Sequence, residues 1–481
     1  MKIYDLNEIA SITGGRIRIN ETGMARISRV VTDSRSASEG DLFVALPGDR
    51  FDGHDFIAQA VSAGCRAVCV SNESKIPSGD IQAVIVNDTL AAYQMIAARS
   101  RIDSAYKVAA VTGSVGKTST REFIACALSG EFKVHKTREN FNNEIGLPKT
   151  LLEAPDDCDI CVVEMAMRAQ GQIRDLTMIA KPDIAVITNI GMAHIGLLGS
   201  REAIFKAKTE IVEGLRSNGT VVLNCDDPML LGYSKDISGQ HRVAAVYTGR
   251  HREDISADLT VRCTDVISGP DNSVVQIEMI FDKVRKVVIP DLRIPVPGSH
   301  NISNALLGIA VAAVSGASAE SIRESLGSYM PVGNRQRVIR HDGITIIDDT
   351  YNAGPESMKA AIDLLMSYKT SGRHIAVLGG MLELGRFSRK EHGTIGRYCA
   401  DKGVDMVFAQ LPEAQWYVDG AGASDKDAFT RFYCFEDRAS LTGALKHEVR
   451  EGDVLMVKGS RGFQMEEISA FLTGNSMLLK H

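Results

Sequence analysis

Residues 107–118 couple an apolar strand to the start of a helix through a turn that contains two glycines. Lys107–Val111 has the composition of a buried strand, and Thr112–Thr118 follows it directly. Glycines let backbone N–H groups turn towards a phosphate, and the N-terminus of a helix adds a positive dipole. Lys117 can reach the β- and γ-phosphates of a nucleotide, and the Thr118 hydroxyl can bind Mg²⁺. This order predicts a nucleoside-triphosphate site.

The loop differs from the common pattern GxxxxGK[ST], because Val111 stands where that pattern has glycine. The alternative is a chance Gly-Lys-Thr in an ordinary turn. A strand before the loop and a helix after it favour phosphate binding. The residues expected to contact the nucleotide are Thr112, Gly113, Ser114, Val115, Gly116, Lys117, Thr118 and Ser119.

The chain has 481 residues, whereas a single core stops growing near ~250–300 residues. We expect three α/β domains: residues 1–105, 106–330 and 331–481. In the central domain, apolar runs alternate with helical segments, which predicts a mostly parallel sheet covered by helices. The expected strands there are Lys107–Val111, Asp159–Met165, Asp183–Ile190 and Thr220–Asn224.

The flanking domains show the same alternation with shorter elements. Between about Asp258 and Ile289 the period becomes two, which predicts an antiparallel β insertion, and a helix begins near Asn301. The third domain is predicted to be Rossmann-like. The remaining expected strands are Arg29–Thr32, Leu42–Ala45, Ala67–Val70, Ala83–Val86, Ile344–Asp348, His374–Leu378, Asp405–Ala409 and Asp453–Val457, and Asp88–Arg101 is an expected helix.

Composition and charge restrict the class of partner. Hydrophobic residues are 44% and charged residues 24%, which is ordinary globular composition. The net charge of −6 gives no electrostatic reason to expect nucleic acid or an anionic membrane. No apolar stretch approaches the ~18–20 residues of a membrane span, and residues 1–10 are not expected to form a signal peptide. Nine scattered cysteines fit reduced thiols in the cytoplasm.

Polar residues at predicted strand ends are candidates for the site. Glu164 ends an apolar strand, where a Mg²⁺ ligand and a solvated strand end are equally plausible. His194 follows the next strand, although a lone histidine is more often packed or at the surface. Asn142 and Asn143 lie in an asparagine cluster typical of a turn. Lys208 shares a helix with Lys206, and both could be solvated.

Two further segments lie at strand ends of the third domain. Asp349, Tyr351 and Asn352 follow a buried strand, where acidic residues commonly meet a ribose or a metal. Lys458–Gly462 is a basic glycine-containing turn that suits a phosphate or a carboxylate, and a plain surface turn is the alternative.

Taken together, these segments resemble the ATP-dependent Mur ligases of peptidoglycan synthesis over essentially the whole chain. Each motif is modest, but their order and spacing are specific. The segments that carry the resemblance are Thr112–Thr118, Asn140–Pro148, Val163–Met165, Thr188–His194, Ala207–Lys208, Pro297–Asn304, Asp348–Pro355, Leu378–Gly385 and Lys458–Gly462.

The resemblance implies an N-terminal domain that holds a UDP-sugar, a central domain that holds ATP, and a C-terminal domain that brings the amine. In this family a carboxylate attacks the γ-phosphate of ATP, and an amine displaces phosphate from the acyl phosphate. The branch most similar to this chain adds D-alanyl-D-alanine to UDP-MurNAc-tripeptide. A monomer in the cytoplasm is expected.

The resemblance also implies roles for single residues. Lys117, Glu164, His194 and Lys208 correspond to the catalytic set, and Thr118, Glu164 and His194 lie on or near two Mg²⁺ ions. Lys208 matches a lysine that reacts with CO₂ to form a carbamate able to bind the second ion. Nucleotide contacts are implied for Asn304, Arg335 and Asp349, and substrate contacts for Ser34, Arg35, Asn142, Asn143, Tyr351 and Asn352, with Tyr351 beside the adenylate.

The chain departs from the family pattern at three places. Gly380 stands where aspartate is expected, Gly354 where asparagine is usual, and Arg138-Glu139 where glycine is common. The first two lie near the expected binding site of the amine, so the resemblance defines the identity of the amine substrate less closely. The residues expected to act in phosphoryl transfer are unchanged.

Three alternatives remain. A sister ligase adds the third amino acid, lysine or diaminopimelate, but its Asp-Asn-Pro-Arg motif is missing from this sequence. Folylpolyglutamate synthase lacks the N-terminal UDP-binding domain expected here. A non-catalytic nucleotide-binding protein would keep the loop without needing Glu164, His194 and Lys208. Whether the tripeptide carries lysine or diaminopimelate is left open.

Overall fold

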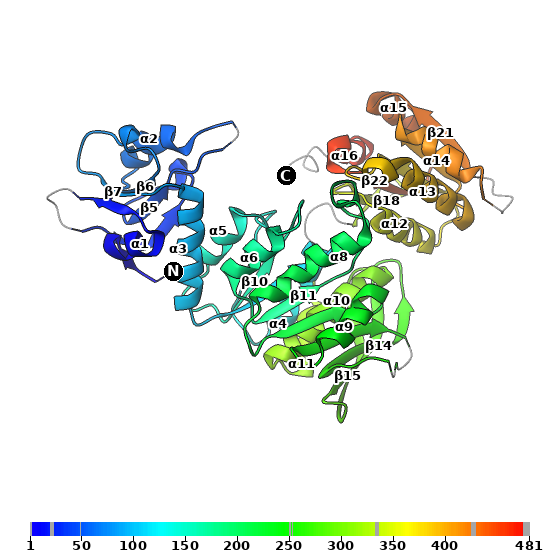
Figure 1. Cartoon of the computed structure of the whole chain (residues 1–481). Coiled ribbons are helices and arrows are strands. Elements are labelled where there is room, and N and C mark those ends of the chain that lie inside the picture. The colour runs from blue at the N-terminus through cyan, green and yellow to red at the C-terminus, as the bar shows by residue number, and fades with distance from the viewer. Residues whose placement is uncertain are drawn as a thin grey trace.

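The fold was analysed in a computed structural model, which describes residues 2–19, 24–48, 50–249, 252, 254–331, 336–424 and 430–474. Three main sheets follow one another along the chain, and each forms the centre of a separate lobe (Figure 1). The N-terminal lobe is blue, the central lobe cyan to green and the C-terminal lobe yellow to red. The predicted α/β class is confirmed.

The N-terminal lobe is built on a five-stranded sheet of order β2-β7-β6-β5-β4, next to a small β1-β3 pair. The long helix α3 packs against α5 and α6 of the central lobe, so it joins the two bodies (Figure 1). The elements are β1 Tyr4–Asp5, α1 Leu6–Thr13, β2 Arg16–Arg18, β3 Arg26–Ile27, β4 Arg29–Val31, β5 Asp41–Val44, α2 Ile57–Ser62, β6 Ala67–Val70, β7 Gln82–Ile85 and α3 Thr89–Asp103.

The central lobe contains a nine-stranded sheet of order β16-β15-β14-β13-β12-β11-β8-β10-β9. The elements up to the middle of this lobe are β8 Lys107–Thr112, α4 Lys117–Leu128, β9 Val134–Lys136, α5 Gly146–Leu152, β10 Ile160–Glu164, α6 Gln172–Ala180, β11 Ile184–Ile187, α7 Ile195–Leu198 and α8 Arg201–Thr209. Those that follow are β12 Thr220–Asn224, α9 Pro228–Ile237, β13 Arg242–Thr248, β14 Leu259–Ser268, β15 Ser273–Phe281, β16 Arg285–Ile294, α10 Ser299–Ser315 and α11 Ala319–Gly327.

Helices cover both faces of this sheet, and strand β8 shows the consequence. Val108 and Ala110 lie in one apolar cluster with α5, α6 and α9, whereas Ala109 and Val111 lie in another with α4, α10 and α11. A strand buried on both faces needs apolar residues at every position, which explains the continuous run in the sequence.

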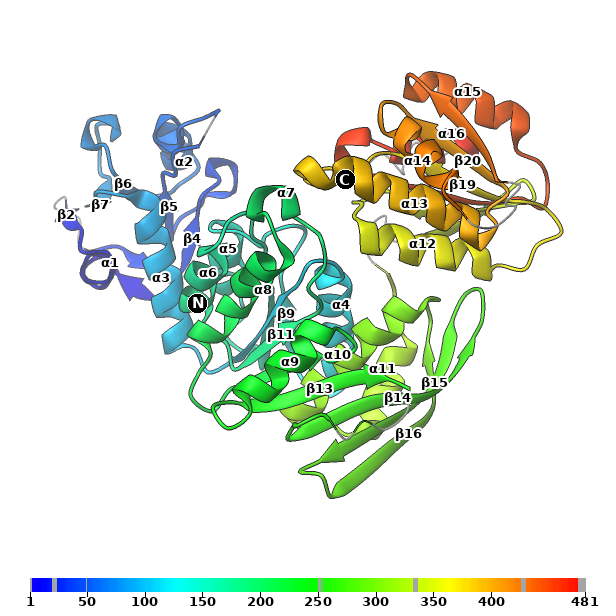
Figure 2. The same cartoon turned by 45° about the vertical axis from the view of Figure 1, so that its right-hand side comes forward.

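The antiparallel strands expected near residues 258–289 are confirmed. Strands β14, β15 and β16 are antiparallel to one another, as the period-two pattern predicts. Strand β14 pairs in parallel with β13, so the three strands extend the nine-stranded sheet of the central lobe (Figure 2). A hairpin can continue any sheet that offers a free edge, and local periodicity carries no information about that edge.

The C-terminal lobe has a six-stranded sheet of order β17-β18-β22-β19-β20-β21, in which only β17 is antiparallel to its neighbour. Helices α12, α13 and α14 cover one face, and α15 and α16 the other. The elements are β17 Arg337–His341, β18 Ile344–Asp349, α12 Pro355–Ser367, β19 His374–Leu378, α13 Ser388–Lys402, β20 Met406–Gln410, α14 Glu413–Ala421, β21 Arg431–Phe435, α15 Arg438–Glu448, β22 Val454–Lys458 and α16 Glu466–Thr473.

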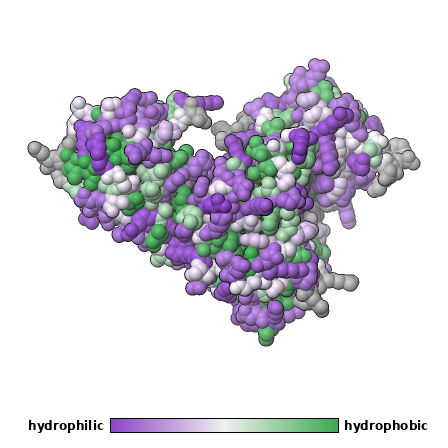
Figure 3. Space-filling view, in the orientation of Figure 1, coloured by the Kyte–Doolittle hydropathy of each residue, from purple (hydrophilic) through white to green (hydrophobic). Residues whose placement is uncertain are grey.

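The surface in Figure 3 is largely hydrophilic, and it is hollowed between the N-terminal and C-terminal lobes. Within the described part of the chain, no helix is both long and apolar enough to cross a membrane. The nine cysteines all lie in described segments and are free thiols.

Candidate nucleotide and metal site

The predicted phosphate loop connects β8 to α4 and takes a conformation that requires its two glycines. Gly113 has a φ of 151° and Gly116 a φ of 82°. A Cβ atom at Gly113 would lie 1.9 Å from Thr188 Oγ1, and one at Gly116 would lie 2.8 Å from Asn304 Oδ1. Neither position accommodates a side chain, so the glycines let the loop pack closely against Thr188 and Asn304.

The end of β11 fixes the loop from the side. The backbone N–H groups of Ser114 and Val115 donate to the backbone oxygen and the side-chain Oδ1 of Asn189, at 3.1 and 3.0 Å. In return, Thr188 Oγ1 donates to the carbonyl of Val115 at 2.6 Å. Thr188 and Asn189 belong to one of the predicted motifs, but their contacts, which hold the loop in one shape, have no signal in the sequence.

Lys117 is the first residue of α4. Its ammonium donates to the carbonyl of Gly113 at 2.9 Å and also approaches the carbonyl of Ser114. The lysine therefore lies over the loop, with its charge where a bound phosphate would meet it. Thr112 has another role, since its hydroxyl donates to the carbonyl of Met165 at 2.9 Å and ties β8 to the end of β10.

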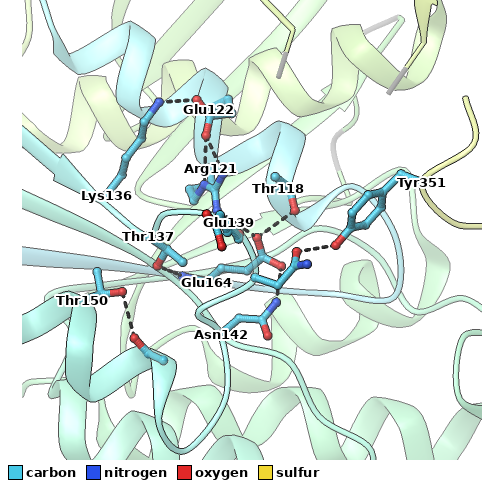
Figure 4. A network of polar contacts seen from close by, with 12 residues as sticks. Thr118, Arg121, Glu122, Lys136, Thr137, Glu139, Asn142, Thr150, Glu164 and Tyr351 are labelled. Atoms are coloured by element: carbon cyan, nitrogen blue, oxygen red, sulfur yellow. Dashed lines mark hydrogen bonds and ion pairs between the residues drawn. The ribbon is translucent and has the colours of Figure 1, made fainter. Parts of the chain in front are cut away.

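Glu164 ends β10 directly beside the loop (Figure 4). Its side chain is only 3% exposed. Oε2 accepts a hydrogen bond from the Thr118 hydroxyl at 2.8 Å, and Oε1 accepts one from the Asn142 amide at 2.9 Å. The structure therefore brings together the three residues that the sequence could only place in separate segments.

Behind Glu164 lies a chain of alternating charges that the sequence analysis did not identify. Arg121 of α4 lies 3.5 Å from Glu164 and donates to Glu122 through two nitrogens, at 2.6 and 3.1 Å. Glu122 also contacts Lys136 of β9. Helical spacing could have indicated that Arg121 lies near Glu164. Residues three apart share a face of a helix, and Thr118, three residues earlier, faces Glu164.

His194 lies at the N-terminus of α7 in the left-handed conformation, with a φ of 65°. For a non-glycine residue this costs about 1–3 kcal/mol and is typical of functional sites. Its Nδ1 is 2.6 Å from Glu383 Oε2, although the two groups are not aligned as a hydrogen bond. Burial lowers the pKa of His194, while Glu383 opposes that shift.

Two carboxylates of the C-terminal lobe therefore reach the segment that carries His194. The Glu383 carbonyl accepts a hydrogen bond from the Gly196 amide at 3.0 Å. Glu356 of α12 accepts one from the Met192 amide at 2.9 Å. Neither glutamate was predicted, because contacts between lobes have no local sequence signal.

Lys208 lies on α8 and is 1% exposed, whereas Lys206 on the same helix is exposed. The solvated-lysine interpretation is therefore wrong for Lys208 and right for Lys206. Burial and the nearby charge of Lys117 hold the pKa of Lys208 well below its usual range. Among the described residues, no carboxylate lies within ion-pair distance of its ammonium.

On the C-terminal side, Asp349 at the end of β18 forms an ion pair with Lys458 at the end of β22. The 2.6 Å contact is buried, and Lys458 also donates to the carbonyl of Asn352 at 2.9 Å. The Tyr351 hydroxyl donates to Asn140 Oδ1 of the central lobe (Figure 4). The Asn352 side chain accepts from the backbone of Ala353, which shapes its own turn.

A cleft of about 1180 Å³ lies between the central and C-terminal lobes. Most predicted site residues line it, namely Ser114, Val115, Gly116, Lys117, Thr118, Ser119, Asn142, Asn143, Glu164, His194, Asn304, Asp349, Tyr351 and Asn352. Thr112, Gly113 and Lys208 lie outside its lining, as do Ser34 and Arg35 of the N-terminal lobe. Arg335 falls outside the described residues.

The described side-chain contacts of Ser34 and Arg35 lie within the N-terminal lobe. The buried Ser34 hydroxyl donates to Gln59 at 2.8 Å, and the exposed Arg35 pairs with Asp33 at 2.7 Å. Asn143 matches the turn interpretation of the asparagine cluster, because its side chain accepts from the Gly146 amide at the start of α5 at 2.9 Å.

The three departures from the family pattern have different surroundings. A Cβ at Gly380 would lie 2.5 Å from Phe463 Cζ, so an aspartate there requires Phe463 to move. The space around Gly354 is open. Glu139 has a φ of 45°, which explains why glycine suits that position.

The donors beside the loop fit Mg²⁺. The described residues contain no group of three or more His, Cys, Asp or Glu side chains that could hold a metal ion. Mg²⁺ commonly uses one or two protein oxygens together with water and substrate phosphates. The Thr118 hydroxyl and the Glu164 carboxylate, 2.8 Å apart, provide such a pair. A protonated Lys208 would repel a metal cation.

The fold and the loop are those of a P-loop nucleotide-binding protein whose site faces a second α/β domain. Family profiles match in chain order: "Mur ligase family, catalytic domain" at residues 26–109, "Mur ligase middle domain" at 111–312, and "Mur ligase, glutamate ligase domain" at 334–461. The chain belongs to the Mur ligase family.

Individual relatives are similar to this chain over nearly their full length. A protein of Bacillus subtilis (strain 168) named UDP-N-acetylmuramoyl-tripeptide–D-alanyl-D-alanine ligase is 36% identical over 465 residues, 96% of this chain and 97% of its own. A crystal structure of MurF from Acinetobacter baumannii superposes with a TM-score of 0.85 at 30% identity, covering 100% of both chains. The structure of MurF from Thermotoga maritima in complex with ADP superposes with a TM-score of 0.77 at 29% identity, covering 93% of this chain and 97% of that one.

Proposed function

We propose that this chain is an ATP-dependent ligase that joins D-alanyl-D-alanine to UDP-N-acetylmuramoyl-tripeptide and releases ADP and phosphate. Its similarity to the Bacillus subtilis ligase over 96% of the chain supports the substrates. The observation that carries the chemistry is the contact of Glu164 with Thr118 beside the loop, because it unites a nucleotide site with a buried carboxylate.

The reaction proceeds in two steps. A carboxylate oxygen of the tripeptide attacks the γ-phosphorus of ATP, the bond to the β–γ bridging oxygen breaks, and ADP leaves. The dipeptide amine then attacks the acyl carbon, loses a proton and expels phosphate from the tetrahedral intermediate. Negative charge on the transferred group is stabilised by Lys117 and by the N–H groups at the start of α4.

Mg²⁺ supplies positive charge to the phosphates when it is bound. Thr118 and Glu164 would hold one ion, and His194 lies on the same side of the cleft. Asn304 and Asp349 line the cleft where the nucleoside is expected, and Arg335 is proposed to join them. Asn142, Asn143, Tyr351 and Asn352 are proposed to face the substrates, with Ser34 and Arg35 at the UDP group.

Lys208 is proposed to carry a carbamate. A neutral amine is the form that adds to CO₂, and burial favours that form in Lys208. The neutral nitrogen forms a bond to the CO₂ carbon, a C=O π bond of CO₂ opens to give the carboxylate, and the nitrogen loses one proton, so a neutral amine becomes an anion. That anion is suited to a second Mg²⁺, whereas the buried ammonium has no described carboxylate partner.

The test is release of phosphate from ATP with each acceptor omitted in turn. We expect release only when UDP-MurNAc-tripeptide and D-alanyl-D-alanine are both present. Release that ignores D-alanyl-D-alanine and responds to lysine or diaminopimelate with the dipeptide precursor would identify the sister ligase. Binding of ATP without release for any amine would indicate a non-catalytic protein.

We further propose a monomer that works in the cytoplasm. The free state of all nine cysteines supports a reducing compartment. Light scattering of the purified enzyme tests the monomer, and fractionation of cells tests the location.

A further inference from the structure

Arg121 has an unusual position for an arginine, since its side chain is buried at 3% exposure without touching the cleft. It lies on α4 three residues after Thr118, so the two side chains point to the same side of the helix. That side faces Glu164, as Figure 4 shows.

The guanidinium makes contacts in three directions. Its Nε and Nη2 donate to Glu122 Oε1 at 3.1 and 2.6 Å. Its Nη1 donates to the backbone carbonyl of Glu139 at 3.2 Å and lies 3.5 Å from Glu164 Oε2. One side chain therefore connects the helix after the phosphate loop, the carboxylate at the end of β10, and the segment before Asn142.

The charges along this line alternate and sum to zero. Lys136, Glu122, Arg121 and Glu164 contribute +1, −1, +1 and −1, and the last three are buried. Apart from Arg121, the described donors to the Glu164 carboxylate are the neutral Thr118 hydroxyl and Asn142 amide. A buried carboxylate without a charged partner is costly. Because Glu122 neutralises Arg121, the arginine orients Glu164 without adding net charge against a cation.

The contact with Glu139 links Arg121 to the other oxygen of the Glu164 carboxylate, Oε1, by way of the chain between residues 139 and 142. Glu139 lies in the left-handed region, and Arg121 ties its carbonyl to α4. Three residues later, Asn142 donates to Glu164 Oε1. Arg121 thus lies beside Glu164 Oε2 directly and is linked to Oε1 through the 139–142 segment.

We infer that Arg121 is a positioning residue that holds Glu164 and the 139–142 segment in the arrangement that accepts the Mg²⁺ of the bound nucleotide. The inference rests on the proposed function for the assignment of Glu164 to that ion. Partners that orient a metal ligand typically contribute 10–100-fold to metal affinity or activity.

The experiment measures binding of ADP by calorimetry to the full chain, once with Mg²⁺ and once with EDTA. The dissociation constant of ADP in EDTA divided by that with Mg²⁺ gives the gain in ADP affinity that Mg²⁺ provides, which we call the Mg²⁺-dependent gain. We expect Arg121→Gln to reduce this gain by about 10–100-fold, while binding of ADP in EDTA changes by less than about threefold because the loop and Lys117 are intact. Arg121→Lys keeps the charge but not the three-way contact, so it should recover part of the gain.

Arg262→Gln is the matched control, because Arg262 pairs with the largely buried Glu278 in the same domain at 2.5 Å and does not line the cleft. It should leave the gain unchanged. A second comparison places Arg121→Gln in a Glu164→Gln background, where the arginine substitution should have no further effect on the gain.

An unchanged gain in Arg121→Gln, or in Arg121→Lys if the glutamine variant does not fold, would overturn the inference. Equal losses with Mg²⁺ and with EDTA would also overturn it, because they would indicate general damage to the loop. If the wild-type chain shows no Mg²⁺-dependent gain, the metal assignment in the proposed function fails instead, and the two failures are distinct.

Discussion

His194 of the central domain lies 2.6 Å from Glu383 of the C-terminal domain, so a candidate metal ligand on one lobe is in contact with a carboxylate on another. Burial lowers the pKa of His194 and Glu383 partly offsets it. We therefore expect Glu383→Gln to lower the pKa of His194 further. An NMR titration of the nucleotide-free enzyme measures this, and a pKa that stays constant or rises would show that the contact is not formed in solution.

Lys208 and Lys206 lie on one helix and differ in burial, which makes them a matched pair. Lys208→Ala should reduce ligation at least about 100-fold, because a metal ion contributes several kcal/mol and each 1.4 kcal/mol is tenfold. Lys206→Ala should retain activity. High bicarbonate should not restore Lys208→Ala, whereas short carboxylates should restore part of it. Full activity of Lys208→Ala would refute the carbamate.

Lys117 should be needed for phosphoryl transfer but not for folding. Its ammonium donates to the backbone carbonyl of Gly113 and approaches that of Ser114, both in the loop itself. We expect Lys117→Ala to lower phosphate release by about 10²–10³-fold, as for loss of one group that stabilises transition-state charge. Thermal melting should be nearly unchanged. Release close to that of the wild type would contradict the assignment of the loop.

Gly113 is predicted to tolerate no side chain, and Gly171 provides the comparison. Both have positive φ, but a Cβ at Gly171 would meet nothing within 4 Å, whereas one at Gly113 would meet Thr188 Oγ1. Gly171→Ala should cost about 1–2 kcal/mol of stability from backbone strain alone. Gly113→Ala should cost more than ~3 kcal/mol and abolish binding of ADP. Equal effects of the two substitutions, measured by denaturation, would rule out the steric explanation.

Asp348 gives a prediction for pH. Burial, with a further contribution from Asp349, raises the pKa of Asp348 to about 6. A carboxyl with a higher pKa in the folded than in the unfolded state binds more protons when folded. Its contribution to stability is therefore present at low pH and is lost as pH rises through about 6. Asp348→Asn should stabilise the C-terminal domain at pH 8 by up to ~3 kcal/mol, and at pH 4.5 by only about a third of that, because this pH lies just above the ordinary pKa of the unfolded carboxyl.

The single tryptophan, Trp416 on α14, reports on this domain. Urea unfolding followed by its fluorescence at the two pH values measures the difference. An equal gain at both pH values would assign the effect to something other than the ionisation of Asp348.

The sequence predicts the interior strands well because a strand covered on both faces has an unbroken apolar run. Strand β8 and its neighbours β10, β11 and β12 all fall within the expected ranges, to within a few residues. Edge strands are harder to predict. Strand β9, at Val134–Lys136, is only partly buried and carries two polar residues, so its pattern does not differ from that of a loop.

The site shows the same division between local and distant effects. The pairing of Thr118 with Glu164 follows from two neighbouring parallel strands, β8 and β10, whose carboxyl ends meet at one edge. The contacts of Glu383 with His194, and of Tyr351 with Asn140, depend on how two lobes meet. Burial of Lys208 but not Lys206 depends on which face of α8 packs inward, and the short helix has too few apolar residues to define that face.

Dipeptide ligation is tested most directly by the mass of the product formed from ATP, UDP-MurNAc-tripeptide and D-alanyl-D-alanine. We expect a new amide that carries the whole dipeptide, with one product molecule formed for each ADP. ADP production without a new amide, or ligation of a single amino acid to the dipeptide precursor in preference to D-alanyl-D-alanine, would contradict this expectation.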